Sequence, residues 1–247
     1  MATPVTCTII AKNEAERIGR TIRSVQGLVN EVLVIDSGST DGTQDIAREL
    51  GAKVIFNPWP GFGFQKRFAE DAASHDWILN LDADEWLGPE IRAELAALLE
   101  FSELPARSFS MHVTMVYPGR DKPCFLADDN NCVRLYDRRV TRYANSLVFD
   151  KVPATPDMRQ LKAPVLHQSF KSLSHLIHKE VDYYNLQKRE IKKSRWVLAL
   201  RMPFEFPLQF IKFYIIRKHV FGGAYGLVLS LVVAFMRWVR LLVLFGW

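Results

Sequence analysis

Cysteine is scarce in this chain of 247 residues, and two common nucleotide-binding motifs are missing from it. The three cysteines, Cys7, Cys124 and Cys132, are too few and too scattered to predict a disulfide framework or a zinc site. No Gly-x-Gly-x-x-Gly follows the first apolar run and no Gly-x-x-x-x-Gly-Lys-Ser/Thr loop occurs, which argues against a nicotinamide or flavin cofactor and a P-loop. Cys7 lies within an apolar run, so we expect a reduced, cytosolic setting. No basic, apolar leader opens the chain, so we do not expect secretion.

The overall composition is that of a globular protein with an excess of positive charge. Hydrophobic residues make up 49% of the chain and charged residues 24%, which argues against disorder. The net charge of +5 and the isoelectric point of about 9.1 favour anionic partners, meaning a nucleotide, a phospholipid or a nucleic acid.

The first hundred residues alternate between strand and helix patterns. Continuous apolar runs predict strands at 5–11, 32–35, 53–56 and 77–81, and apolar residues at helical spacing predict helices at 14–25, around 46–50, at 64–73 and at 89–99. Thr40 or Asp41 is expected to cap the second helix. Such alternation predicts right-handed βαβ crossovers and an α/β fold, with a mostly parallel sheet covered by helices on both faces.

After Pro105 the pattern changes. Residues 109–117 alternate between apolar and polar, which predicts a longer strand with one wetter face, and shorter strands are predicted at 132–136, 147–152 and 161–167. Residues 171–193 are predicted to form a helix, whose end carries the basic residues Lys188, Arg189, Lys192, Lys193 and, just beyond, Arg195.

The last forty-five residues are strongly apolar and aromatic. Residues 220–236 contain no charged residue, and Arg237 and Arg240 interrupt the apolar run that follows. A membrane-spanning helix needs about 20 apolar residues, whereas basic residues among aromatic and aliphatic ones are typical of helices that lie in a membrane interface. The sequence favours membrane association and leaves open a hydrophobic helix pair packed on the domain or in a dimer.

Polar side chains follow three of the predicted strands. Asn13 and Glu14 follow the first, Asp36 and Ser37 end the second, and Asp82-Ala83-Asp84 ends the fourth. Open α/β sheets bind ligands at the carboxyl ends of their strands, and a divalent ion is commonly held by one or two carboxylates together with nucleotide phosphates. The alternatives are a solvated acidic turn at 82–84 and an ordinary turn-forming aspartate at 36.

Three motifs stand in a characteristic order: Ile-Ile-Ala-Lys-Asn-Glu at 9–14, Val-Ile-Asp-Ser-Gly-Ser-Thr-Asp-Gly-Thr at 34–43 and Asp-Ala-Asp-Glu at 82–85. Together they resemble glycosyltransferase family 2, whose members have the GT-A fold. Within this family, the sequences at 61–66 and 77–82 resemble those of the lipopolysaccharide inner-core β-glucosyltransferases. Residues 134–139 and the basic, aromatic tail extend that likeness.

The resemblance implies a role for each matching residue. Glu14 and Asp36 would face the uridine, Asp82 would lie on the ribose and phosphate side, and Lys66 or Arg67, whose alternative is a solvated helix face, would approach the diphosphate. Family members place a base after the Arg-Leu-Tyr strand, usually as the acid of a His-Glu pair; here Phe149 replaces the histidine and Asp150 supplies the carboxylate, with Glu85 and Asp128 as alternatives. The implied set is Asn13, Glu14, Asp36, Ser37, Lys66, Arg67, Asp82 and Ala83 for the nucleotide sugar, Asp84 for Mn²⁺ or Mg²⁺, and Asp150 as the base. His167, at the end of a predicted strand, is our candidate to replace the missing histidine as a second metal ligand.

The function that these patterns predict is an inverting, metal-dependent glycosyltransferase. It would move a hexose, glucose by resemblance, from a UDP-sugar to a sugar hydroxyl of a lipid-linked glycan such as the lipopolysaccharide core. We expect a GT-A domain at 1–198, with a nucleotide-sugar half at 1–104 and an acceptor half at 105–198, and membrane-associating helices at 199–247. The predicted location is the cytoplasmic face of the inner membrane, on an anionic lipid surface, without nucleic acid. The alternatives are a polyprenyl-phosphate glycosyltransferase of the same fold and a non-enzymatic, membrane-associated nucleotide-binding module.

Overall fold

The structure is a computed structural model that describes residues 3–190 and 194–245. The chain forms two compact units. The first comprises residues 1–113 and 130–167, and the second comprises residues 114–129 and 168–247. The division into functional domains at 104 and 198 stays a prediction.

Within the described residues, nine strands form one sheet in the order β3-β2-β1-β4-β7-β6-β9-β5, with β8 paired to β6. β1, β2, β3 and β4 run parallel to one another, and β7 is antiparallel to β4. The sheet is therefore mixed, with a parallel half that comes from the first hundred residues. The strands are β1 Val5–Ala11, β2 Glu31–Asp36, β3 Lys53–Phe56, β4 Trp77–Asp82, β5 Glu85–Leu87, β6 Ser108–Met115, β7 Asp129–Asp137, β8 Arg159–Gln160 and β9 Val165–His167.

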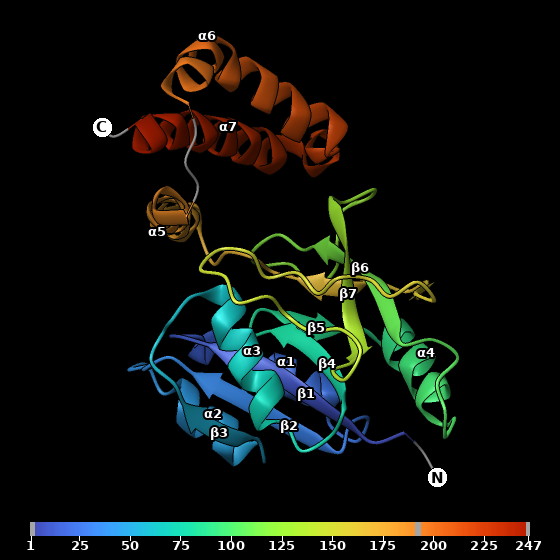
Figure 1. Ribbon diagram of the computed structural model, residues 1–247. Coiled ribbons are helices and arrows are strands. Elements are labelled where there is room, and N and C mark those ends of the chain that lie inside the picture. The colour runs from blue at the N-terminus through green and yellow to red at the C-terminus, as the bar shows by residue number, and fades with distance from the viewer. Residues whose placement is uncertain (1–2, 191–193, 246–247) are drawn as a thin grey trace. The chain divides into compact units, whose positions relative to one another are not determined.

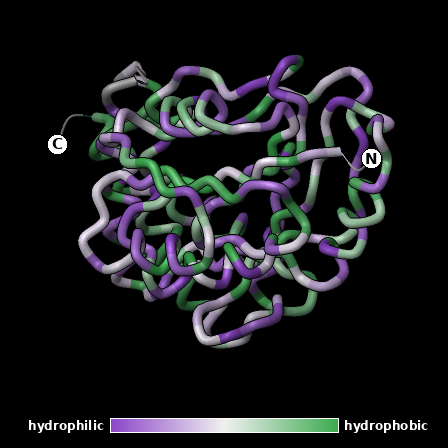
Figure 2. Tube along the Cα trace, turned by 90° about the horizontal axis from the view of Figure 1, so that it is seen from below, coloured by the Kyte–Doolittle hydropathy of each residue, from purple (hydrophilic) through white to green (hydrophobic). Residues whose placement is uncertain are grey.

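Helices cover both faces of the parallel half, because successive residues of a strand point to opposite sides. Ile9 of β1 packs with the helices α1 Ala15–Val25, α2 Thr43–Glu49 and α4 Pro89–Leu99. Ile10, the next residue, packs with the helix α3 Phe62–Ala72 on the other face. Figure 1 shows α3 in front of these strands and α1 behind them. In the trace coloured by hydropathy, hydrophobic and hydrophilic stretches alternate along the chain (Figure 2).

The predicted elements of the first hundred residues all occur, with bounds that differ by at most three residues. The strands at 5–11 and 53–56 and the helix at 89–99 have the predicted bounds. The N-cap of α2 is Gly42, at φ +90°, rather than Thr40 or Asp41. Asp41 instead accepts a hydrogen bond from the backbone N–H of Thr43 at 3.1 Å.

Two strand predictions were wrong or too long, and one strand was missed. Of the strand predicted at 161–167, only β9 Val165–His167 forms. Residues 147–152 form a loop rather than a strand, and the carbonyl oxygen of Leu147 accepts a hydrogen bond from the backbone N–H of Phe62 at the start of α3. β5 was not predicted. It is only three residues long, and its partner β9 lies about eighty residues further along the chain.

The second unit contains α5 Leu173–Glu190, α6 Arg195–Ile211, the π-helical turn η1 Lys212–Ile216, the 3₁₀ turn η2 His219–Gly222 and α7 Gly223–Phe245. Residues 191–193, including Lys192 and Lys193 of the predicted basic run, lie outside the described residues. Tyr117 packs in this unit, and its hydroxyl lies 2.7 Å from Nδ1 of His219. A Cβ at Gly222 would lie 2.5 Å from the Tyr117 hydroxyl, so this glycine allows the close packing.

The helical segment His219–Phe245 is, within the described residues, the one helix long and apolar enough to cross a membrane by length and composition. Large apolar side chains are also exposed along α6 and the turns that follow it. They include Trp196, Leu200, Phe204, Leu208, Ile211, Ile215 and Ile216.

Candidate functional site

The carboxyl ends of β1, β2 and β4 meet at one edge of the sheet. In the strand register Asp36 lies opposite Ala11, and Asp82 lies opposite Ile10. The three polar strand ends predicted from the sequence are therefore neighbours. This is the edge at which open α/β sheets bind ligands.

The ends of β1 and β2 are tied together by hydrogen bonds. The backbone N–H of Asn13 donates to Oγ of Ser39 at 2.9 Å, and the Asn13 side-chain oxygen accepts from the backbone N–H of Thr40 at 2.9 Å. Asn13 has a positive φ of +56°, a conformation that asparagine tolerates better than most residues. The Glu14 carboxylate pairs with Arg17 at 2.6 Å, and its backbone N–H donates to Oγ1 of Thr43 at 2.8 Å.

Asp36 is fully buried and shapes the loop that follows β2. Its Oδ2 accepts hydrogen bonds from the backbone N–H groups of Gly38 and Ser39 at 2.8 and 2.9 Å and from Nε2 of Gln44 at 2.7 Å. Ser37 is also buried, and its Oγ accepts a hydrogen bond from Nε2 of Gln65 at 3.0 Å. These bonds give Asp36 the turn-forming role that the sequence had left as an alternative.

Asp84 and His167 come together beside the acidic turn. Nε2 of His167 lies 3.2 Å from Oδ1 of Asp84, and Nη1 of Arg17 lies 3.5 Å from Oδ2 of the same carboxylate. The pairing of β5 with β9 brings this about, because it sets His167 directly opposite Glu85. Ala83 is buried in the turn, and its carbonyl accepts a hydrogen bond from Thr21 at 2.9 Å.

Lys66 is a buried cation between two carboxylates. Its side chain is 1% exposed, and Nζ lies 2.8 Å from Oδ1 of Asp82 and 3.1 Å from Oδ2 of Asp150. Burial lowers the pKa of Lys66, but Asp82 and Asp150 outweigh it, so the pKa lies well above its usual value and the group is charged. Burial likewise raises the pKa of Asp82, but Lys66 and Arg134 lower it to about 2.

Arg67, the neighbour of Lys66, has a different role. Its Nη1 donates to the carbonyl oxygen of Tyr143 at 3.0 Å, and its Nε lies 3.8 Å from Glu70. The structure therefore brings Lys66, but not Arg67, into contact with the predicted acidic residues. Lys66 is not on a solvated helix face.

Arg134 and Glu85 form a second buried pair next to Asp82. The guanidinium of Arg134 contacts Glu85 through Nη2 and donates from Nη1 to Oδ1 of Asn80 at 3.2 Å. Oε2 of Glu85 accepts a hydrogen bond from the backbone N–H of Asp82 at 3.1 Å. Glu85 is fully buried, which makes it a poor candidate for a base. No role was predicted for Arg134, although it lies in a recognised sequence motif.

The loop that carries Asp150 is held against the start of α3. The backbone N–H groups of Phe62 and Gly63 donate to the carbonyl oxygens of Leu147 and Ser146 at 3.1 and 3.0 Å. These bonds satisfy two of the four N–H groups that a helix start leaves unpaired. Oγ of Ser146 in turn accepts from the backbone N–H of Phe149 at 2.9 Å. Asp150 follows with its side chain 40% exposed, accessible to a ligand and in contact with Lys66.

Asp128, the other alternative base, belongs to the second unit. Its Oδ2 lies 2.7 Å from Nη1 of Arg217 within that unit.

The protein's side chains offer some, but not all, of the ligands that a metal ion needs. Within residues 3–190 and 194–245, no group of three or more His, Cys, Asp or Glu side chains is arranged to hold an ion. Asp84 and His167 offer one carboxylate and one imidazole 3.2 Å apart. A pair of ligands fits an ion that completes its coordination with substrate phosphates and water, as Mg²⁺ commonly does.

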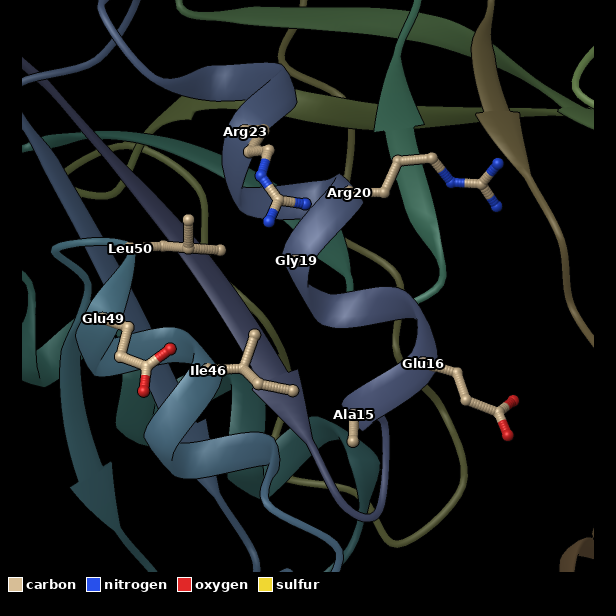
Figure 3. A pocket seen from close by; sticks show the side chains of 8 residues that line it. All are labelled: Ala15, Glu16, Gly19, Arg20, Arg23, Ile46, Glu49 and Leu50. Atoms are coloured by element: carbon tan, nitrogen blue, oxygen red, sulfur yellow. The ribbon is translucent and has the colours of Figure 1, made fainter.

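A separate groove of about 570 Å³ lies between α1 and α2 (Figure 3). Arg23 reaches toward Ile46 and Leu50, whereas Arg20 points away and stacks on Trp86 at 3.6 Å. None of the predicted site residues lines this groove, so we do not regard it as the active site.

The model of the family described as glycosyl transferase family 2 matches residues 6–170 of the chain. The chain belongs to glycosyltransferase family 2. An uncharacterized glycosyltransferase of Rickettsia prowazekii is 36% identical over 244 residues, which cover 94% of this chain and 84% of the relative. A lipopolysaccharide core biosynthesis glycosyltransferase of Rhizobium meliloti, LpsC, is 35% identical over 105 residues, which cover 40% of this chain and 38% of LpsC.

Among solved structures, one similar to this glycosyltransferase is glucosyl-3-phosphoglycerate synthase from Mycobacterium tuberculosis in complex with Mn²⁺, uridine diphosphate and glucosyl-3-phosphoglycerate. It is 29% identical, covers 47% of this chain and 45% of its own, and has a TM-score of 0.37. Family membership confirms two predictions made from the sequence: the enzyme class, a glycosyltransferase, and the α/β GT-A fold.

Proposed function

We propose that this family 2 enzyme is an inverting, metal-dependent transferase that moves a hexose from a UDP-sugar to a sugar hydroxyl of a lipid-linked glycan. The observation that carries the proposal is the position of Lys66, which joins Asp82 on the donor side to Asp150 on the acceptor side. One compact site thus has groups for a nucleotide diphosphate and for an attacking hydroxyl. Glucose and the lipopolysaccharide core as acceptor rest on the sequence resemblance, with LpsC as a partial relative.

The donor half of the proposed site consists of the strand ends and the metal pair. Asp84 and His167 would hold Mn²⁺ or Mg²⁺, with Asp82 beside them on the ribose and phosphate side. The ion, when bound, supplies Lewis-acid stabilisation of the departing diphosphate. Asn13, Glu14 and the loop shaped by Asp36 would enclose the nucleoside, with Ser37 and Ala83 in the walls.

The acceptor half depends on Asp150. A carboxylate within hydrogen-bond reach of the acceptor hydroxyl takes its proton as the oxygen attacks the anomeric carbon. Lys66 lies 3.1 Å from Asp150, and a nearby cation favours the ionised carboxylate that a base must be. Attack on the side opposite the leaving diphosphate inverts the anomeric centre.

We further propose that the second unit attaches the enzyme to the cytoplasmic face of the inner membrane, as a peripheral or monotopic protein. Trp196, Leu200 and Phe204 are exposed at helical spacing on α6. Two exposed lysines, Lys212 and Lys218, follow α6 in the chain. Exposed aromatic and aliphatic side chains with flanking lysines suit an anionic lipid surface. This attachment would bring the site to a lipid-linked acceptor.

The test is the thermal stability of the protein in detergent with UDP, GDP, CDP, dTDP or ADP, each with and without Mn²⁺. A ligand that binds only the folded state raises its melting temperature. We expect a shift that is selective for UDP and depends on Mn²⁺. A protein that responds to none of the five nucleotides would contradict the proposed donor site.

A further inference from the structure

A turn in the loop between β6 and β7 exposes two large apolar side chains. The loop comprises residues 116–128 and lies within the second compact unit. The backbone N–H of Ala127 donates to the carbonyl oxygen of Cys124 at 3.0 Å, which closes the turn. Its two central residues, Phe125 and Leu126, are 74% and 47% exposed. Turns at a protein surface ordinarily have polar residues or glycine at such positions.

Leu126 holds this position against its own backbone preference. Its φ is +50°, in the left-handed region that a bulky side chain disfavours and that glycine or asparagine usually occupies in a turn. Burial does not offset this strain, because about half of the side chain faces solvent. Strained backbone is found preferentially at functional sites. A leucine that is both strained and exposed indicates that its side chain contacts something outside this chain.

The base of the loop is fastened to the helices of the same unit. Tyr117 belongs to a buried cluster with Leu229 of α7, and Cys124 packs against that cluster. At the far end of the loop, Oδ2 of Asp128 lies 2.7 Å from Nη1 of Arg217. The loop is therefore held at two points on either side of the turn, and these contacts fix the direction in which Phe125 and Leu126 project.

The turn η2 extends this exposed apolar surface. The ring of Phe221 packs edge-on against Phe125, with 5.6 Å between the ring centroids, and is itself half exposed. Val220, beside it, is exposed as well. Along the chain the surface continues from α6 through the exposed Ile215 and Ile216. We call its outer part the apolar tip, which consists of Phe125, Leu126, Val220 and Phe221.

The charges around the apolar tip are mainly positive. Arg120 and Lys122 in the loop and Lys218 before η2 are exposed, and they outnumber the one exposed carboxylate of the loop, Asp121. Aromatic and aliphatic side chains flanked by cations suit the headgroup region of an anionic bilayer, where the cations meet lipid phosphates. A second copy of this chain fits less well, because its own tip would present the same positive charge.

We propose that the apolar tip inserts into the headgroup region of an anionic bilayer, as a membrane contact that is separate from α6. The inference rests on the membrane attachment proposed above and adds a loop that lies about seventy residues before α6 in the chain. Because β6 leads directly into this loop and β7 directly out of it, the attachment then involves the segment between two strands of the sheet and not only the C-terminal helices.

The first test places a tryptophan at the tip and asks whether it enters the bilayer. The full chain with Phe125→Trp is bound to vesicles of equal parts phosphatidylglycerol and dibrominated phosphatidylcholine, whose bromine atoms quench tryptophan emission at short range. Phe101→Trp makes the same change at a position of the first unit that is 60% exposed and is the matched control. The wild type gives the quenching of the native tryptophans, among them Trp196 on α6.

The second test separates binding from stability. Leu126→Gly and Leu126→Asn remove the apolar side chain and relieve the positive φ. We expect both variants to melt at the wild-type temperature or above it, and their partition onto the anionic vesicles to fall by about tenfold, as the loss of one buried apolar side chain predicts. A leucine with only a structural role would give the opposite result, a lower melting temperature with unaltered partition.

We expect the added emission of Phe125→Trp to be quenched and that of Phe101→Trp to be unaffected. Vesicles of dibrominated phosphatidylcholine alone should quench less, because they lack the anionic charge; equal quenching would overturn the assignment to an anionic surface. An unquenched tryptophan at 125 on vesicles that do quench the wild type would overturn the tip and leave the attachment through α6 in place. Equal quenching at 101 and 125 would also overturn it. A wild type that binds neither kind of vesicle contradicts the proposed membrane attachment itself, and the tip falls with it.

Discussion

Nζ of Lys66 lies 3.1 Å from Oδ2 of Asp150, although the two residues are 84 positions apart in the chain. The same ammonium group lies 2.8 Å from Asp82 at the end of β4. One buried cation therefore connects α3, the parallel sheet and the loop that follows β7. Its partners are the carboxylates to which we assign the donor and acceptor sides of the reaction.

Lys66→Met should damage both stability and transfer. The variant loses the bonds of Lys66 to two carboxylates that are partly exposed, one of which, Asp82, is also paired with Arg134, so we expect a cost of about 2 kcal/mol of unfolding free energy. We expect urea unfolding to show a loss of this size and glycosyl transfer to fall with it. Arg67→Met, on the same helix, removes one hydrogen bond to the Tyr143 carbonyl and should cost only about 1 kcal/mol. Equal losses of unfolding free energy in the two variants would show that the bonds of Lys66 to the carboxylates contribute no more than the single hydrogen bond of Arg67.

Asp84 and His167 should control the response to Mn²⁺. If both bind the ion, His167→Ala should raise the Mn²⁺ concentration needed for half of the UDP-induced thermal shift by about tenfold or more. Asp84→Asn should abolish the Mn²⁺-dependent part of the shift. His178→Ala, at an exposed position on α5, is the control and should respond like the wild type. A His167→Ala protein with an unaltered Mn²⁺ response would remove this histidine from the metal site.

Asp150→Asn should separate binding from turnover. The amide cannot take a proton from the acceptor, so we expect turnover to fall by roughly 10²- to 10⁴-fold. The UDP-induced thermal shift should remain. Asp45→Asn, on the surface of α2, controls for the loss of one carboxylate. Unchanged turnover in Asp150→Asn would assign the base to another residue, or favour an acceptor phosphate that needs no base.

The parallel half of the fold could be predicted closely because its signals are local. Val5–Ala11 is a continuous apolar run that is buried along its whole length, and Pro89 marks the start of α4. β5 gave no such signal, since Glu85–Leu87 is stabilised by pairing with β9, far away in the chain. The segment 147–152 was wrongly predicted to be a strand, because no local pattern shows that the Leu147 carbonyl bonds to the start of α3, far earlier in the chain.

The candidate site was predictable in its acidic residues but not in its cations. Asp82 and Asp84 end an apolar strand, and that position alone brings them to the sheet edge. Lys66 and Arg67 look equivalent in the sequence, and only the packing of α3 buries the first and directs the second toward Tyr143. The environment of Arg134 depends on Glu85 and Asn80, which lie about fifty residues earlier, so no local pattern could reveal it.

Glu31 should make stability depend on pH in the acidic range. Burial raises the pKa of Glu31, but hydrogen bonds from Ser74 and Thr6 outweigh it and hold the pKa below the ordinary value of 4.5. A lowered folded-state pKa stabilises the protein above the unfolded pKa, and this contribution is lost as the pH falls through the folded-state pKa. The stability difference between wild type and Glu31→Gln should therefore shrink from about pH 6 to about pH 3. Urea unfolding across this range measures it, with Glu103→Gln at an exposed position as the control; a constant difference would contradict the assignment.

Gly63→Ala should displace the loop that carries Asp150. A Cβ at Gly63 would lie 2.3 Å from the carbonyl oxygen of Ala144 and 2.7 Å from that of Phe149, so backbone has to move. We expect a loss of about 1–3 kcal/mol of stability from the overpacking. Because Asp150 directly follows Phe149, turnover should also fall, by about tenfold to a hundredfold for a shift near 1 Å. Urea unfolding and the transfer assay measure the two effects.

Gly19→Ala is the matched control, since it adds the same methyl group to a helix of the same unit. At Gly19 the nearest atoms are Nη1 of Arg23 at 3.2 Å, the end of a flexible side chain, and Ile46 and Leu50 at 3.6 Å (Figure 3). Alanine is favoured over glycine within a helix by about 1 kcal/mol, so this variant should be as stable as the wild type or more so, with unaltered turnover. If Gly63→Ala behaved in the same way, contact with α3 could not be what positions the loop. Asp150 would then be positioned by its bond to Lys66 rather than by the start of α3.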